Sequence, residues 1–302
     1  MKKYFISLLV FISFIGCFSK PQPPSWAVNI PQDNPKYFYA SAQAFTKEGA
    51  IKQALNDIAS RLNVSVSSNL LINKGIFKDK AYNEISQQIN TKVSKIHFNN
   101  YKVIKSKQID NQVYVLVQVD KNKLKEQLRS DIKLKLTKIS NLLTNIPYPL
   151  QKIQNSYKAI KLIKQTKRTI LMLQTLGADT SKYVEKLAKL AQKASNYLKT
   201  TKFSIKTNKF KQITMDVMSK YFNISKNANL IKINITLKRN YILRQYLIIG
   251  KANINFKSQT ITIRFKGASY TNYKSAMFKA SQDFKHKLES NIKKLLGLEN
   301  NE

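Results

Sequence analysis

The spacing of apolar residues changes twice along this chain of 302 residues, and the change limits the folds that it can adopt. Up to about residue 120, and again from residue 201, apolar and polar residues alternate over short segments, as in strands. In between, apolar residues recur every three or four positions, as in amphipathic helices. We therefore expect an α+β protein with an N-terminal α+β domain over 26–125, a helical region over 126–200 and a C-terminal α+β domain over 201–302.

The N-terminal domain is predicted to run β-α-β-α-β-β. Thr46 is a suitable N-cap for its first helix, and Glu48 lies in the first turn, where the helix dipole favours an acid. Alternation of valine and serine from Val64 predicts a strand directly after that helix. The predicted segments are a strand over 37–45, a helix from Thr46 to Leu62, a strand over 64–72, a helix over 80–94 and strands over 98–108 and 112–119.

The rest of the chain is predicted as antiparallel helices followed by a β-α-β-β-β-α domain. Short connections, such as the turn at Pro147-Tyr148-Pro149, place successive helices side by side in opposite directions. The expected helices cover 121–145, 150–177 and 181–200. The C-terminal domain is expected to contain a strand over 203–205, a helix over 210–222, strands over 231–237, 247–256 and 260–265, and a helix over 273–295.

The first sixteen residues are typical of a secretory signal peptide. Lys2 and Lys3 precede an apolar run over 4–15, which is shorter than the roughly 20 residues that span a bilayer. The run ends in Phe14-Ile15-Gly16-Cys17, which resembles a bacterial lipobox with phenylalanine in place of the usual leucine. We expect cleavage after Gly16 and lipidation of Cys17, the only cysteine; the alternative is a secreted protein without lipid.

Residues 17–25 are predicted to be a lipidated tether. Its proline-rich part, FSKPQPPS, is a semi-rigid spacer. Two or more acyl chains on Cys17 would hold the protein stably on a membrane. Phe18 stands where an inner-membrane retention signal would carry aspartate, so by analogy with enterobacterial sorting we expect the outer membrane.

Four stretches of the N-terminal domain resemble a known family. They are Pro24-Ser25-Trp26, Tyr39-Ala40-Ser41-Ala42, Glu48-Gly49-Ala50 and the run from Ala54 to Ser68. These stretches, with the lipobox, resemble the Helicobacter membrane-associated lipoproteins, the "Lpp-twenty" family, over about residues 17–125. The resemblance implies a membrane location and a non-catalytic role, since members include FlgP-type flagellar outer-membrane lipoproteins and surface antigens.

The residues offer little for catalysis or metal binding. One cysteine and two histidines, His97 and His286, exclude a disulfide framework and most zinc sites. The sequence contains no nucleophile-elbow, zinc-protease, phosphate-loop or dinucleotide motif. The serines of 65–68 fit the polar side of a strand, and the acids at Asp120, Glu126, Asp131 and Asp179 have basic neighbours. We therefore predict a non-enzyme without cofactor, metal or small-molecule substrate.

Charge is the other strong feature of the sequence. Lys and Arg number 53 against 16 Asp and Glu, a formal net charge of +37 that grows towards the C-terminus. Such a surface favours anionic partners, although abundant Lys, Asn and Ile also fit the composition of an AT-rich genome. We expect an outer-membrane-anchored scaffold with envelope or flagellar protein partners. The alternative is a module that binds DNA, lipopolysaccharide or an anionic glycan through residues 201–302.

Overall fold

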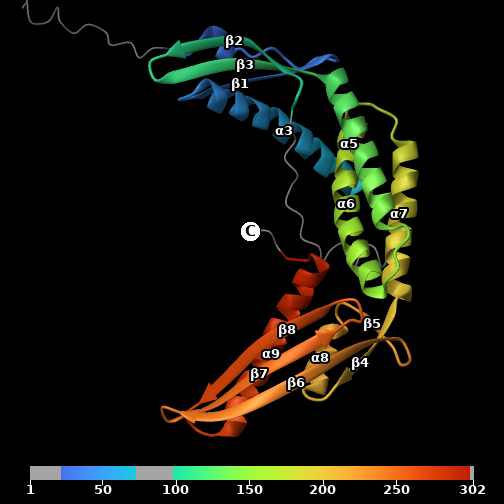
Figure 1. The fold of residues 1–302 in the computed structure, drawn as a ribbon. Helices are drawn as coiled ribbons and strands as arrows, with labels where there is room; N and C mark the ends of the chain where they lie inside the picture. The colour runs from blue at the N-terminus through green and yellow to red at the C-terminus, as the bar shows by residue number, and fades with distance from the viewer. Residues whose placement is uncertain (1–21, 73–97, 300–302) are drawn as a thin grey trace, which may run out of the picture. The chain divides into compact units, whose positions relative to one another are not determined.

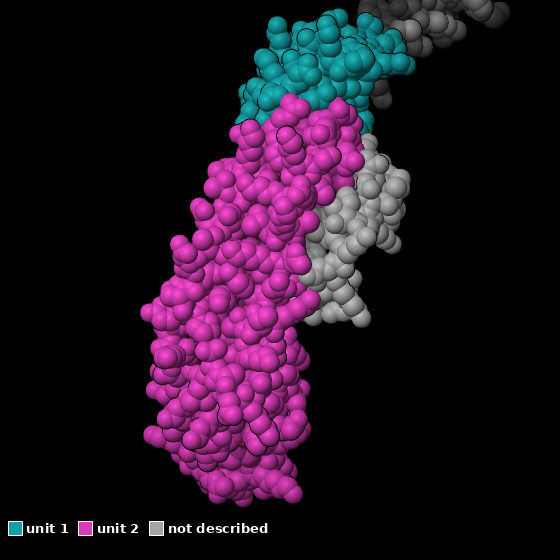
Figure 2. Space-filling view, turned by 90° about the vertical axis from the view of Figure 1, so that its right-hand side faces the viewer, with its two compact units in different colours: residues 1–65, 95–126 teal, residues 66–94, 127–302 magenta. Residues whose placement is uncertain are grey.

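The computed structural model describes residues 22–72 and 98–299, which fall into two compact units. Unit 1 comprises residues 1–65 and 95–126, and unit 2 comprises residues 66–94 and 127–302 (Figure 2). The predicted signal peptide, Gly16, Cys17, the helix over 80–94 and His97 lie outside the described residues. The mixture of helices and sheets confirms the α+β class.

Unit 1 contains a three-stranded antiparallel sheet with the order β1-β3-β2 (Figure 1). The strands are β1 (Tyr37–Ala44), β2 (Tyr101–Ile109) and β3 (Gln112–Asp120). The short helix α2 (Ser25–Val28) contacts β1 and β3, and the long helix α3 (Lys47–Ile72) follows β1. Ala54, Ile58 and Leu62 are buried at intervals of four along α3, as the sequence pattern predicts.

The start of α3 is capped as predicted, but its end is not where the sequence placed it. The N–H of Gly49 donates to Thr46 Oγ1 at 3.1 Å. The strand predicted over 64–72 is wrong, because α3 continues to Ile72. No glycine or proline separates Leu62 from Ile72, and Val66 and Leu70 continue the four-residue spacing of Ile58 and Leu62. The alternation of valine and serine over 64–68 therefore also fits the apolar spacing of the helix, and the helix continues through it.

Three long helices follow the first sheet, as predicted. They are α5 (Lys121–Leu142), α6 (Pro149–Thr175) and α7 (Ser181–Thr200). The side chain of Asn155 on α6 donates to the carbonyl of Leu142, and the hydroxyl of Tyr197 on α7 donates to the carbonyl of Leu143. These bonds use carbonyls at the C-terminal end of α5, which have no partner within the helix.

The C-terminal part of unit 2 is a five-stranded sheet with the order β5-β4-β6-β7-β8 (Figure 1). Its strands are β4 (Lys202–Thr207), β5 (Asn223–Ile224), β6 (Asn229–Ile242), β7 (Gln245–Asn255) and β8 (Thr260–Ser269). β4 pairs with β5 and β6 in parallel, and the pairs β6–β7 and β7–β8 are antiparallel. The predicted order is confirmed, except that it omitted the two-residue strand β5.

Helices α8 (Lys211–Met218) and α9 (Tyr273–Leu296) cover one face of this sheet. Phe265 on β8 packs against Phe284 on α9 with ring centroids 5.1 Å apart, and Phe210, just before α8, contacts both rings. Gly267 allows α9 to approach β8, because a Cβ at that position would lie 2.1 Å from the backbone nitrogen of Ala280.

Two hydrogen bonds join α6 to the C-terminal part of unit 2. The side chain of Gln154 on α6 donates to the carbonyl of Leu295 on α9 at 3.1 Å, and the hydroxyl of Tyr157 donates to the carbonyl of Tyr221 at 3.3 Å. Burial raises the pKa of Tyr157 to about 12, so this hydroxyl keeps its proton.

Among the described residues, no helix has the length and apolar character needed to span a bilayer.

Candidate functional site

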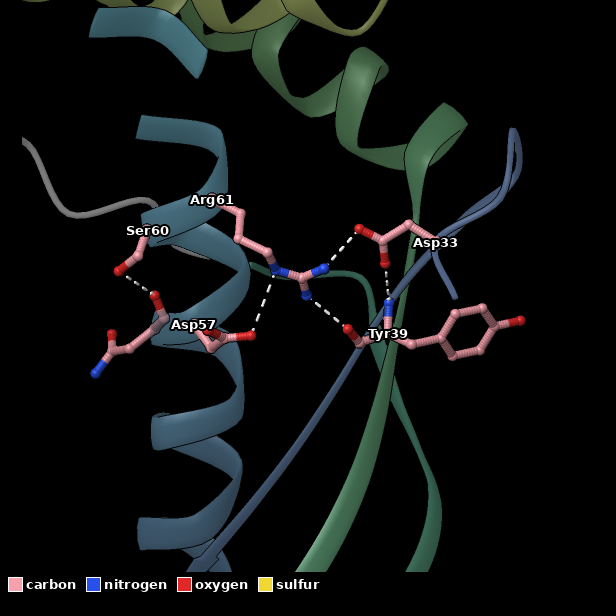
Figure 3. A network of polar contacts seen from close by, with 6 residues as sticks. Asp33, Tyr39, Asp57, Ser60 and Arg61 are labelled. Atoms are coloured by element: carbon pink, nitrogen blue, oxygen red, sulfur yellow. Dashed lines mark hydrogen bonds and ion pairs between the residues drawn. The ribbon is translucent and has the colours of Figure 1, made fainter. Parts of the chain in front are cut away.

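A connected cluster of polar groups in unit 1 is centred on Arg61 of α3 (Figure 3). Its guanidinium donates to Asp33 Oδ2 at 2.6 Å and to the carbonyl of Tyr39 at 2.5 Å, and its Nε lies 3.4 Å from Asp57 Oδ2. Asp33 also accepts the N–H of Tyr39 at 2.9 Å. The cluster joins α3 to β1 and to the segment before it, so it stabilises the fold of unit 1.

The acids that the sequence offered as candidates hold local structure. Asp120 Oδ1 accepts the N–H groups of Asn122 and Lys123 at the start of α5. Asp131 pairs with Lys135 at 2.6 Å on the same helix. The N–H and hydroxyl of Ser181 hold the pKa of Asp179 below its ordinary value at the start of α7. Glu126 lies on α5, one to two turns before Asp131.

Of the two histidines, only His286 lies among the described residues, and it belongs to no candidate metal site there. His286 is exposed on α9, and His97 lies outside the described residues. Within residues 22–72 and 98–299, no three His, Cys, Asp or Glu side chains gather closely enough to hold a metal ion. The serines of 65–68 lie on α3.

The surface with the most distinctive chemistry is the face of the five-stranded sheet that α8 and α9 leave uncovered. Along β6, Ile231, Ile233 and Ile235 are buried beneath the helices, and the residues between them are exposed on the opposite face. We call this opposite face the basic face. Six of its charged residues are Lys206, Lys232, Lys238, Lys251, Arg264 and Lys266. Its uncharged polar residues include Asn234, Asn253, Asn255, Thr236 and Thr262.

The strand register places like charges next to one another on the basic face. Lys251 pairs with Arg264 across β7 and β8, and Lys206 pairs with Lys232 across β4 and β6. Like charges directly opposite on neighbouring strands destabilise a sheet, whereas opposite charges stabilise it. None of the six basic residues has an ion pair with a carboxylate among the described residues. Stability of the sheet alone therefore does not account for this arrangement.

Three acidic residues of this part of the chain, Asp216, Asp283 and Glu289, lie on its helices. The five strands contain no Asp or Glu, and none occurs between Asp216 and Asp283. Asp283 on α9 accepts the N–H of Lys266 at 2.8 Å and pairs with Lys287 at 2.9 Å. Burial would raise the pKa of Asp283, but these two contacts lower it more.

Glu289, one turn and a half further along α9, follows the same rule. Burial would raise its pKa, but hydrogen bonds from Tyr221 and Lys220 outweigh burial and hold the pKa below its ordinary value. Burial and the neighbouring carboxylate together raise the pKa of Tyr221. The negative charges are thus compensated within the helical layer, and the field of the basic face remains positive.

The basic face is suited to a partner with repeated negative charges and hydroxyl groups. Lysine provides a flexible point charge, and the asparagine and threonine side chains between the lysines provide hydrogen-bond donors and acceptors. The aromatic rings of these strands point to the other side: Phe203 and Phe265 are buried, and Tyr241 stacks with Tyr246 at 5.0 Å. The basic face therefore has no platform on which bases could stack.

The sequence shows the excess of basic residues in the C-terminal part, but it does not show directly that they share the basic face. A signal was present, because every second residue of 232–238 and of 251–255 is Lys, Asn or Thr, without an acid.

Comparison with known proteins agrees with the family resemblance. Residues 24–120 match the family model of the LPP20 lipoprotein. The chain is also similar to a solved structure, the secreted protein HP1454 from the human pathogen Helicobacter pylori, with 16% sequence identity and a TM-score of 0.51. That similarity covers 86% of this chain and 98% of the other, and it concerns the fold alone. No curated protein matches the sequence.

Proposed function

We propose that this chain, a lipoprotein of the LPP20 type over residues 24–120, is a non-catalytic envelope protein that holds an anionic glycan on its basic face. Lipid on Cys17 would fix it to the outer membrane, and unit 2 would bind the polymer. The protein would then act as a scaffold that connects a membrane to an envelope polymer. The observation that carries the proposal is the basic face itself, with six cations and no carboxylate on the strands.

A glycan that bears phosphate or carboxylate groups fits this face better than a nucleic acid does. Arg264 is the only arginine among the six cations, so bidentate recognition of bases or phosphates has little support. Sugar hydroxyls match the asparagine and threonine side chains, and no aromatic ring is available for bases. A lipoprotein of the envelope also meets phosphorylated and carboxylated glycans where it resides.

The test compares two triple variants that remove the same charge. One changes Lys232, Lys251 and Arg264 to Gln on the basic face; the control changes Lys133, Lys138 and Lys186 to Gln on exposed positions of α5 and α7. Binding to dextran phosphate is measured over a range of salt concentrations, with uncharged dextran as the blank. We expect the face variant to lower the slope of log affinity against log salt by roughly 2 to 3, since each neutralised charge contributes about 0.7–0.9.

Three results would count against the proposal. Equal losses in the two triple variants would mean that net charge alone drives binding. Salt-insensitive binding would exclude an electrostatic contact. Tighter binding to double-stranded DNA than to dextran phosphate under the same salt would favour the nucleic-acid alternative.

The anchor and the scaffold role need separate measurements. A Cys17→Ser form should leave membranes that are washed in high salt, and its retention there would contradict the lipid anchor. A protein partner, envelope or flagellar, is supported by the family resemblance. Crosslinking in native membranes followed by a high-salt wash would identify such a partner if it is recovered in stoichiometric amount.

A further inference from the structure

The tip of the β6–β7 hairpin exposes large apolar side chains at the end of the sheet. The strands pair up to Ile242 and Gln245, and Leu243 and Arg244 form the two-residue turn. Leu243 is 90% exposed and Ile242 is 51% exposed. Because Ser269, the last residue of β8, pairs with Tyr246, the tip reaches beyond the neighbouring strand (Figure 1). We call Tyr241, Ile242, Leu243 and Arg244 the hairpin tip.

The backbone of the hairpin tip is unusual for the residues it contains. Leu243 and Arg244 have φ angles of 51° and 60°, in the left-handed region. Two-residue hairpin turns with both central residues in this region strongly prefer Asn-Gly or similar pairs, because a Cβ is crowded there. A leucine at such a position, with its side chain in solvent, contributes neither to the turn nor to the core. The strained backbone and the exposed leucine together point to a function for the side chain.

Aromatic and basic residues surround the hairpin tip. The rings of Tyr241 and Tyr246 lie 5.0 Å apart, and those of Tyr246 and Tyr273 lie 4.9 Å apart. The guanidinium of Arg239 lies over the ring of Tyr273 at 5.6 Å. Tyr270, just after β8, is 73% exposed. Tyrosine and arginine side chains around a protruding leucine and isoleucine have the composition of a membrane-interface contact.

We propose that the hairpin tip inserts Leu243 and Ile242 into the interface of a membrane that contains anionic lipid. Charge complementarity supports this occupant, since Arg239 and Arg244 are close in sequence to Leu243 and Lys274 follows Tyr273, whose ring contacts that of Tyr246. No acid occurs between Asp216 and Asp283. The same charges repel a second copy of the chain. The proposal does not depend on the glycan, because the tip and the basic face consist of different residues.

The experiment uses residues 17–302 with Cys17→Ser, a form that retains every described residue and lacks the lipid site. Sedimentation with vesicles of equimolar phosphatidylcholine and phosphatidylglycerol measures binding. Leu243→Asn removes the apolar side chain, and asparagine is well tolerated at positive φ. The matched control is Leu230→Asn, because Leu230 is 50% exposed near the other end of β6.

We expect Leu243→Asn to weaken vesicle binding by about tenfold or more, from loss of the transfer of a leucine side chain out of water. The same variant should unfold at a higher urea concentration than the parent, since the turn is relieved of its crowding. A merely structural role of Leu243 cannot produce these opposite effects. Leu230→Asn should leave vesicle binding unchanged, and Leu243→Asn should leave binding to dextran phosphate unchanged.

A label provides a second readout that does not rely on affinity. In the Cys17→Ser chain, Leu243→Cys creates the only thiol, to which an environment-sensitive fluorophore can be attached. Its emission should shift to the blue when vesicles are added, whereas a label at Leu230→Cys should not respond.

The proposal is overturned if Leu243→Asn binds vesicles as the parent does, or if the label at position 243 stays in water. It is also overturned if the parent forms a dimer that Leu243→Asn dissociates, because the occupant would then be a second copy. Loss of dextran phosphate binding in Leu243→Asn would show that the hairpin tip is part of the glycan surface, and would overturn it as a separate membrane contact.

Discussion

Gly267→Ala is expected to separate α9 from the C-terminal sheet. A Cβ at position 267 would lie 2.1 Å from the backbone nitrogen of Ala280 and 2.3 Å from the carbonyl oxygen of Ala276. Ordinary contacts of a Cβ begin at 3.4 Å, so the helix and the strand would have to move apart by more than 1 Å. The obstacle is helix backbone, which cannot rotate away as a side chain can.

The size of the effect follows from what α9 buries. Its inner face carries Ala276, Ala280, Phe284, Leu288 and Ile292, all fully buried. A gap of 0.5–1 Å already forfeits about a quarter to a half of the dispersion energy between facing atoms. Overpacking a core costs about 1–3 kcal/mol, and the rigid obstacle places Gly267→Ala at about 3 kcal/mol or more of the free energy of unfolding.

Urea unfolding followed by far-ultraviolet circular dichroism measures this free energy. Ala268→Ser is the matched control, because Ala268 neighbours Gly267 on the same strand but faces the side away from α9. A loss of less than about 1 kcal/mol in Gly267→Ala would refute the close contact between β8 and α9. A similar loss in Ala268→Ser would show that the strand tolerates no change, whatever the contact.

Two further predictions concern the polar clusters. Arg61→Ala should lower the stability of unit 1 by about 1 kcal/mol, because it removes partly exposed contacts to Asp33, Asp57 and Tyr39. Urea unfolding followed by the fluorescence of Trp26, the only tryptophan, measures this loss, and an unchanged urea midpoint would contradict the prediction. Glu289 binds a proton less readily in the folded than in the unfolded chain. Its contribution to the free energy of unfolding is therefore complete above its ordinary pKa of 4.5 and is lost as the pH falls through the lower folded value. Glu289→Gln should flatten the acid side of a curve of unfolding free energy against pH, and an unaltered curve would contradict this.

In unit 2, basic and acidic residues have different surroundings. Basic residues of the sheet face are uncompensated and open to a polymer, and the acids on α8 and α9 are occupied by local partners. A lipid on Cys17 and the hairpin tip would each hold the protein at a membrane. Binding through the tip alone should weaken in high salt, whereas an acyl anchor should not.

The local elements were mostly determined by the sequence itself. Strict alternation over Ile231, Ile233 and Ile235 can be satisfied only by a strand with one buried face, and spacings of three and four over 273–295 only by an amphipathic helix. The N-cap at Thr46 and the antiparallel helices followed from local chemistry in the same way. Residues 24–68 were sufficient for the family resemblance.

The sequence left one local element ambiguous: 64–72 could form a strand or extend α3, because valine and serine fit both patterns over so few residues. Other features depended on contacts between residues far apart in the chain. Gly267 is an unremarkable position until α9 packs on it. The basic face exists only because the register sets Lys251 beside Arg264 and Lys206 beside Lys232, and because both helices cover the same side of the sheet. Side-chain periodicity is a local property, whereas strand order, register and the choice of covered face arise when distant segments bury their apolar sides together.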